Sequence, residues 1–107
     1  MTRATLSTHV LDIALGRPAR GVGVALVGED GSPIGQGTTG SDGRIADLCP
    51  GGVAPGSYRL VFEVEDYFGD REHLFNAVSL DLEIREARHH HVPLLIGPYA
   101  CSSYRGS

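Results

Sequence analysis

Residues 58–64 read Tyr58-Arg59-Leu60-Val61-Phe62-Glu63-Val64, with a bulky apolar side chain at every second position. Period two is the repeat of a β-strand, because successive side chains of a strand point to opposite faces of its sheet. The row that begins at Tyr58 and ends at Val64 is predicted to face the core, and Arg59 and Glu63 to face solvent. The stretch therefore predicts a core strand of a β protein.

The same alternation recurs along most of the chain, between turns supplied by 15 glycines and six prolines. An Asp30-Gly31 turn is typical of a tight hairpin and is expected to join two successive strands. Residues 78–84 and 91–96 follow one another closely, so we expect them to form neighbouring strands. The further predicted strands cover residues 6–11, 22–26, 34–39, 44–48, 78–84 and 91–96.

The alternation lapses from Asp66 to Phe75, where aromatic, leucine and arginine side chains recur at helical spacing. This segment is predicted to form one short helix of two or three turns. The whole chain, residues 1–107, is predicted to be a single all-β domain. We expect a transthyretin-like, two-sheet antiparallel Greek-key sandwich of seven or eight strands with that one helix.

The composition excludes several classes of partner. The formal net charge is −4, and the nine basic residues, all arginine, are scattered rather than clustered. A basic surface that binds nucleic acid or an anionic membrane is therefore not expected.

The apolar stretches of the chain are shorter than the ~18 residues that a membrane-spanning helix needs. The first residues lack the apolar region of a secretory signal. We expect a cytoplasmic protein in which Cys49 and Cys101 are free thiols rather than a disulfide.

Two histidines are predicted to point away from the core. In the first strand Leu6 and Val10 face inward, so His9 faces outward. In the last strand Val92 and Ile96 face inward, so His91 faces outward, together with Pro93 and Leu95. Apolar neighbours of this kind are typical of an assembly surface. We therefore expect the two histidines to line a space between subunits.

Simpler interpretations of the same residues stay open. A single outward histidine is usually a surface residue without a function. The run from His89 to His91 offers imidazole ligands, but no cysteine or carboxylate pattern completes a tetrahedral set, so neither a metal nor another cofactor is expected. His89 and His90 are interpreted as structural or exposed. Arg44 follows Asp42-Gly43 and is, by itself, a charge beside a turn.

Five stretches along the chain resemble 5-hydroxyisourate hydrolases, the transthyretin-related enzymes of urate breakdown. The tail, Tyr104-Arg105-Gly106-Ser107, and the two histidines are the specific part of the resemblance, because transthyretins share the fold but lack this set. The stretches are Leu6-Ser7-Thr8-His9-Val10-Leu11-Asp12, Gly16-Arg17-Pro18-Ala19, Asp42-Gly43-Arg44, His91-Val92-Pro93-Leu94-Leu95 and Ser102-Ser103-Tyr104-Arg105-Gly106-Ser107. The sequence departs from the family pattern at Ala100-Cys101, where a Gly-Tyr pair is common, at Ser103, and in the short segment 69–75.

The resemblance implies a homotetramer with active sites at the dimer–dimer interface. It implies hydrolysis of 5-hydroxyisourate, a small-molecule substrate, to 2-oxo-4-hydroxy-4-carboxy-5-ureidoimidazoline without a cofactor. The catalytic set maps onto His9, Arg44, His91 and Ser107. A neutral imidazole can take a proton from water, and an arginine can stabilise the oxyanion that forms on the carbonyl.

The last four residues receive further roles. Tyr104, Arg105 and Gly106 are assigned to substrate binding, with Tyr104 and Arg105 also anchoring the tail and Gly106 allowing close backbone approach. The main alternative is a transthyretin-like carrier that binds a small ligand without catalysis, with the histidines only lining its channel. A carbohydrate- or protein-binding module is a weaker alternative, because the chain lacks an exposed aromatic row.

Overall fold

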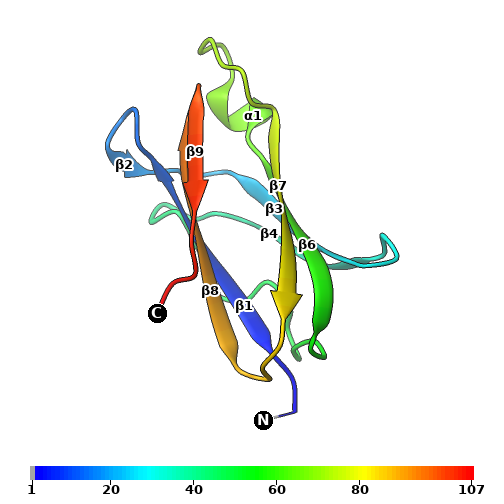
Figure 1. Cartoon of the computed structure of the whole chain (residues 1–107). Coiled ribbons are helices and arrows are strands. Elements are labelled where there is room, and N and C mark those ends of the chain that lie inside the picture. Colours follow the sequence, from blue (N-terminus) through cyan, green and yellow to red (C-terminus); the bar gives the residue numbers. More distant parts are fainter. Residues whose placement is uncertain (1) are drawn as a thin grey trace.

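In the computed structural model, which describes residues 2–107, the chain folds into two facing β-sheets with one short helix (Figure 1). The first sheet has the order β2-β1-β8-β9, and β5 also pairs with β1. The second sheet has the order β4-β3-β6-β7. The elements are β1 (Thr5–Asp12), β2 (Arg17–Pro18), β3 (Gly23–Gly28), β4 (Pro33–Thr38), β5 (Arg44–Ile45), β6 (Gly56–Glu63), α1 (Glu65–Phe68), β7 (Ala77–Ile84), β8 (His89–Gly97) and β9 (Ala100–Ser103).

The core lies between the two sheets and is built from the rows that the alternation predicts. In β6, Leu60 and Phe62 are fully buried while Arg59 is exposed. Leu26 of β3, in the same sheet, and Leu6 of β1 and Leu94 of β8, in the other sheet, are fully buried as well. Burial of such side chains is the main stabilising term in a domain of this size. The two-sheet sandwich predicted from the sequence is confirmed.

Strand pairing differs from the prediction in three respects. Within residues 2–107 there are nine strands rather than seven or eight, because β2 and β5 are two-residue strands and β9 is an additional edge strand. β1 and β8 run parallel, so the sandwich is not wholly antiparallel. The expected pairing of residues 78–84 with 91–96 is wrong, because the chain crosses from one sheet to the other between β7 and β8.

The helix predicted from Asp66 to Phe75 is also wrong in extent. Helix α1 ends at Phe68, and Gly69 follows with a positive φ of 58° that stops the helix. Residues 69–76 form turns and irregular backbone. Phe68 and Arg71 have the spacing of neighbours on a helix, but Arg71 lies beyond the end of α1. Its guanidinium still contacts Phe68, at 5.1 Å from the centre of the ring. No helix in the described residues is long and apolar enough to cross a membrane.

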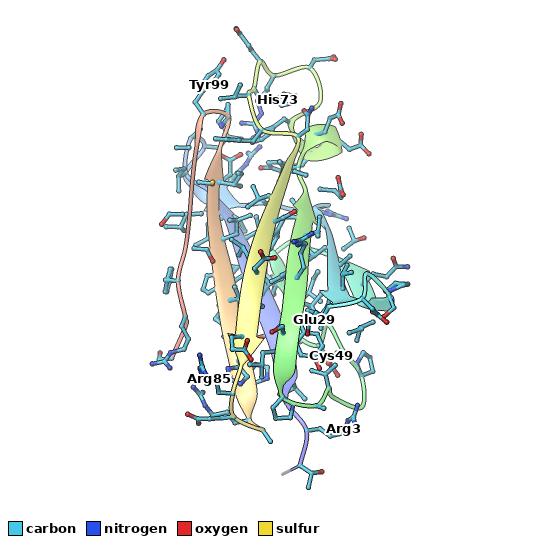
Figure 2. The ribbon with its side chains drawn as sticks, turned by 45° about the vertical axis from the view of Figure 1, so that its right-hand side comes forward. Arg3, Glu29, Cys49, His73, Arg85 and Tyr99 are labelled. Atoms are coloured by element: carbon cyan, nitrogen blue, oxygen red, sulfur yellow. The ribbon has the colours of Figure 1, made fainter. Side chains whose placement is uncertain are left out.

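A buried carboxylate ties α1 and the following loop to the first sheet. Asp12 Oδ2 accepts hydrogen bonds from the Tyr67 hydroxyl at 2.7 Å and from Arg71 Nη2 at 2.8 Å. Burial opposes ionisation of Asp12, but these hydrogen bonds hold the pKa of its carboxyl below the ordinary value. The helix therefore lies at the end of the sandwich near the start of β9. In Figure 2, His73 and Tyr99 mark this end, and Arg3 and Arg85 mark the other.

The two cysteines lie in different surroundings and are not bonded to each other. Cys49 is buried in the core and Cys101 is exposed on β9. Both are free thiols, as predicted. Burial raises the pKa of the Cys49 thiol, so this side chain behaves as a small apolar core residue.

Candidate active site

A tight turn brings Arg44 beside His9. Gly43 has a φ of 77°, and a Cβ at this position would lie 2.4 Å from the carbonyl oxygen of Val10. Only glycine allows this approach, in which the Val10 N–H donates to the Gly43 carbonyl at 2.7 Å. The turn is closed by the Arg44 N–H, which donates to Asp42 Oδ1 at 3.0 Å. As a result β5 pairs with β1, and Arg44 is the register partner of His9.

The parallel pairing of β1 with β8 places the two predicted histidines on one face of the first sheet. Ser7 is the register partner of His91, and His9 is the partner of Pro93, two residues further along β8. Since side chains alternate along a strand, Ser7, His9 and His91 all project away from the core. Both histidines are half-buried in the single chain. This face is where the period-two prediction puts them.

Hydroxyl groups of β1 bond the histidines of β8. Ser7 Oγ lies 2.7 Å from Nδ1 of His91 and 2.8 Å from Nε2 of His89. The other nitrogen of His89, Nδ1, lies 2.7 Å from Thr5 Oγ1. With Nδ1 of His91 held by Ser7, Nε2 is the ring nitrogen left for water or substrate.

The surroundings of His91 disfavour its charged form. Burial lowers the pKa of His91 below the ordinary value, and the nearby charges of Arg44, His9 and His89 lower it further. The imidazole is therefore neutral over a wider range of pH than a solvated histidine. A neutral imidazole is the form that can accept a proton.

The tail packs directly against His91. The Gly106 N–H donates to the His91 carbonyl at 2.8 Å and forms an isolated β-bridge. A Cβ on Gly106 would lie 2.6 Å from Cδ2 of the His91 ring. Glycine is thus required at this position by close contact rather than by a positive φ.

The predicted site residues divide into two groups. A surface pocket of about 400 Å³ is lined by Ser7, Asp42, Arg44, His89 and His91, among others, with His9 paired beside Arg44. This pocket lies on the outward face of the first sheet.

The tail contributes unequally to this pocket. Tyr104 and Arg105 line a different groove, of about 440 Å³, together with the inward-facing Leu6 and Val92. Ser107 follows Gly106 and is exposed. The single chain therefore brings together His9, Arg44, His91 and Gly106, whereas Tyr104 and Arg105 lie on the other side of the sheet.

The sequence alone indicates no catalytic role for Ser7, His89 or Asp42, although all three line the pocket. The sequence does indicate where His89 lies, because the period-two pattern puts His89 and His91 on one face of the strand. Ser7 shares a face with His9 by the same rule. The missing information was the parallel pairing of β1 and β8, which aligns Ser7 with His91.

The arrangement suits proton transfer beside a fixed positive charge. It offers a half-buried imidazole with a lowered pKa and an arginine whose forked donors match an oxygen that gains negative charge. Within residues 2–107, no group of three or more histidine, cysteine or acidic side chains has a geometry that could hold a metal ion. The imidazole can serve in acid–base catalysis, and the arginine can supply electrostatic stabilisation.

Comparisons with known proteins give a consistent result. The model of the HIUase/Transthyretin family matches residues 6–106. A protein of Rhizobium meliloti (strain 1021) named 5-hydroxyisourate hydrolase 2 is 44% identical over 114 residues, covering 95% of each chain. The structure of Klebsiella pneumoniae 5-hydroxyisourate hydrolase has a TM-score of 0.91 and 42% identity, and the match covers 97% of this chain and 99% of that one.

Transthyretin from Sparus aurata is a more distant match. Its crystal structure has a TM-score of 0.83 at 22% identity, and the match covers 94% of this chain and 95% of that one. At this identity the likeness shows the fold alone.

Proposed function

This chain belongs to the HIUase/Transthyretin family, and we propose that its outward pocket hydrolyses 5-hydroxyisourate to 2-oxo-4-hydroxy-4-carboxy-5-ureidoimidazoline. The chain is a hydrolase by its similarity to relatives named for that activity over nearly their whole length. The observation that carries the proposal is the convergence of His9, Arg44 and His91 on one sheet face. A carrier without catalysis has no need of this charged, proton-transferring set.

In the proposed reaction, Nε2 of His91 takes a proton from water, and the hydroxide attacks a ring carbonyl of the substrate. His9 shares the movement of protons to the nitrogen that leaves the carbonyl carbon. The lowered pKa of His91 supports the base role, because the imidazole enters each turnover neutral. General base catalysis of this kind contributes about 10²–10⁴ in rate.

Arg44 supplies the second proposed contribution. Its guanidinium is always charged and presents several donors, so it binds the electron-rich substrate and stabilises the oxyanion. Ser107 is proposed to donate a hydrogen bond to substrate or water. Tyr104 and Arg105 stay predicted as substrate-binding and tail-anchoring residues, and a cytoplasmic location also stays a prediction.

The function is tested by generating 5-hydroxyisourate in a cuvette from urate and urate oxidase. Micromolar protein is expected to speed the ultraviolet decay of the intermediate by at least about tenfold. The same rate is expected in the presence of a strong chelator, because the proposed steps use only side-chain protons and charges. A decay equal to the uncatalysed one would contradict the proposed function. Loss of activity with the chelator, restored by zinc, would contradict the metal-free mechanism.

We also propose that the sites lie between subunits of a homotetramer. The transthyretin-like fold is typical of oligomers, and the outward face of the first sheet carries apolar side chains beside the histidines. Leu11 and Leu95 are cross-strand partners on this face and are only half-buried, and Ile13 is 50% exposed. Pro93 is already buried within the chain.

Light scattering at micromolar concentration is expected to give four times the chain mass of 11.3 kDa. Leu95→Glu is expected to break the tetramer and abolish most activity, because a charge would be buried without a partner. Val61→Glu is the matched control, since Val61 is half-buried on β6, in the other sheet. A fully active monomer would exclude an interface site.

A further inference from the structure

A continuous line of hydrogen bonds runs behind His91. It passes from Nδ1 of His91 to Ser7 Oγ, from Ser7 Oγ to Nε2 of His89, and from Nδ1 of His89 to Thr5 Oγ1, with distances of 2.7, 2.8 and 2.7 Å. The line follows from the parallel register, because Thr5 pairs with His89 and Ser7 pairs with His91. Ser7 is 8% exposed, so its hydroxyl is committed to these two imidazoles.

The number of protons limits how this line can be filled. A serine hydroxyl has one proton to donate and lone pairs to accept. Ser7 therefore donates its proton to one histidine and accepts a proton from the other, which leaves two arrangements of protons along the line. In the first, His91 Nδ1–H donates to Ser7, Ser7 donates to His89 Nε2, and His89 Nδ1–H donates to Thr5. In the second, every donor and acceptor is reversed.

The two arrangements give His91 opposite chemistry. In the first, the proton sits on Nδ1, and Nε2 carries the free lone pair that a general base needs. In the second, Nε2 carries the proton and cannot take another from water. The arrangement of the Ser7 hydroxyl therefore decides whether a neutral His91 can act as a base.

We propose that Ser7 and His89 are positioning residues that hold His91 with its proton on Nδ1 and its lone pair on Nε2. This inference rests on the proposed function, in which His91 is the base. When Nε2 gains the proton of water, the imidazolium Nδ1–H stays bonded to Ser7 Oγ, and Ser7 stays bonded to His89 Nε2. The proton later passes from Nε2 to the leaving nitrogen, so the line itself neither gains nor loses a proton.

The line replaces the carboxylate that orients histidine in serine hydrolases. Its members are neutral. Asp42 lines the same pocket, where its Oδ1 accepts a hydrogen bond from the Arg44 N–H at 3.0 Å. The groups whose charges lower the pKa of His91 are Arg44 from β5, His9 from β1 and His89 from β8 itself. None of these is an anion, which agrees with a His91 pKa below the ordinary value.

The test compares Ser7→Ala, His89→Leu and His89→Gln by kcat, KM and pH profile in the 5-hydroxyisourate assay. Ser7→Ala and His89→Leu are each expected to lower kcat about tenfold, the effect of one lost hydrogen bond, with little change in KM. His89→Gln is expected to recover at least half of the wild-type kcat, because its amide oxygen can accept the Ser7 proton. Ser57→Ala is the matched control, since it removes a hydroxyl bonded to Glu83 at 2.8 Å in the other sheet.

Nitrogen-15 NMR of the wild-type protein, above the pKa of His91, gives a readout that does not depend on activity. We expect a protonated Nδ1 and a bare Nε2 for His91, and a mixture of both forms in Ser7→Ala and His89→Leu. A protonated Nε2 in the wild type, or unchanged kcat in both Ser7→Ala and His89→Leu, would overturn the inference. Recovery by glutamine no better than by leucine would overturn it too. Absence of hydrolysis by the wild type with the expected NMR result would instead reject the proposed function alone.

Discussion

Arg44→Lys is expected to lower kcat about a hundredfold while leaving the fold intact. A lysine keeps the positive charge but presents a single ammonium, which cannot reproduce the forked donors that stabilise an oxyanion. Loss of one such donor typically costs 10²–10³ in kcat. The fold is expected to survive, because the Arg44 side chain is exposed and its bond to Asp42 is made by the backbone N–H. Melting temperature and circular dichroism check this point.

Arg44→Met separates charge from geometry through the pH dependence of the rate. Burial and then the charge of Arg44 lower the pKa of His91, so the wild-type rate rises with pH through a midpoint below the ordinary value of about 6.5. Lysine keeps the charge, and the midpoint is expected to stay in place. Methionine removes the charge, and the midpoint is expected to move to higher pH. Near-normal kinetics in Arg44→Lys would remove Arg44 from the site.

The strands were predictable because each carries its own local signal. The alternation in residues 58–64 marks β6, and Asp30-Gly31 marks the turn between β3 and β4. The same rule places His9 and His91 on the outward face, because burial of one face determines the other. A period of two is therefore sufficient to predict which face a side chain occupies, but not which strand lies beside it.

Features that depend on distant contacts were not predictable from local pattern. The parallel pairing of β1 with β8 joins segments more than 80 residues apart, and it alone aligns Ser7 with His91. The predicted helix is too long, because the spacing of Phe68 and Arg71 suits a helix. In the structure Arg71 lies beyond the helix and bonds Asp12 of β1. Such contacts are tertiary, and they override local propensity.

Deletion of residues 104–107 is expected to lower kcat about a hundredfold, because the tail supports His91 directly. The Gly106 N–H bonds the His91 carbonyl at 2.8 Å, and its backbone lies against the ring. Without this contact the imidazole keeps its bond to Ser7 but loses the support of the tail, and a displacement of about 1 Å at a reacting group can cost 10² in rate. Ser107→Ala removes one hydroxyl and is expected to cost at most about tenfold.

Gly106→Ala tests the contact with the smallest change in the chain. The added Cβ would lie 2.6 Å from Cδ2 of His91 and 3.1 Å from its carbonyl oxygen, so either the ring or the tail must shift. We expect a loss of kcat that falls between those of Ser107→Ala and the deletion. Gly23→Ala is the matched control, since its Cβ would meet only the Cβ of Glu63, at 3.8 Å. If Gly106→Ala and the deletion both kept the wild-type kcat in a well-folded protein, the tail would have no part in holding His91, and the base would have to be oriented by Ser7 and His89 without it.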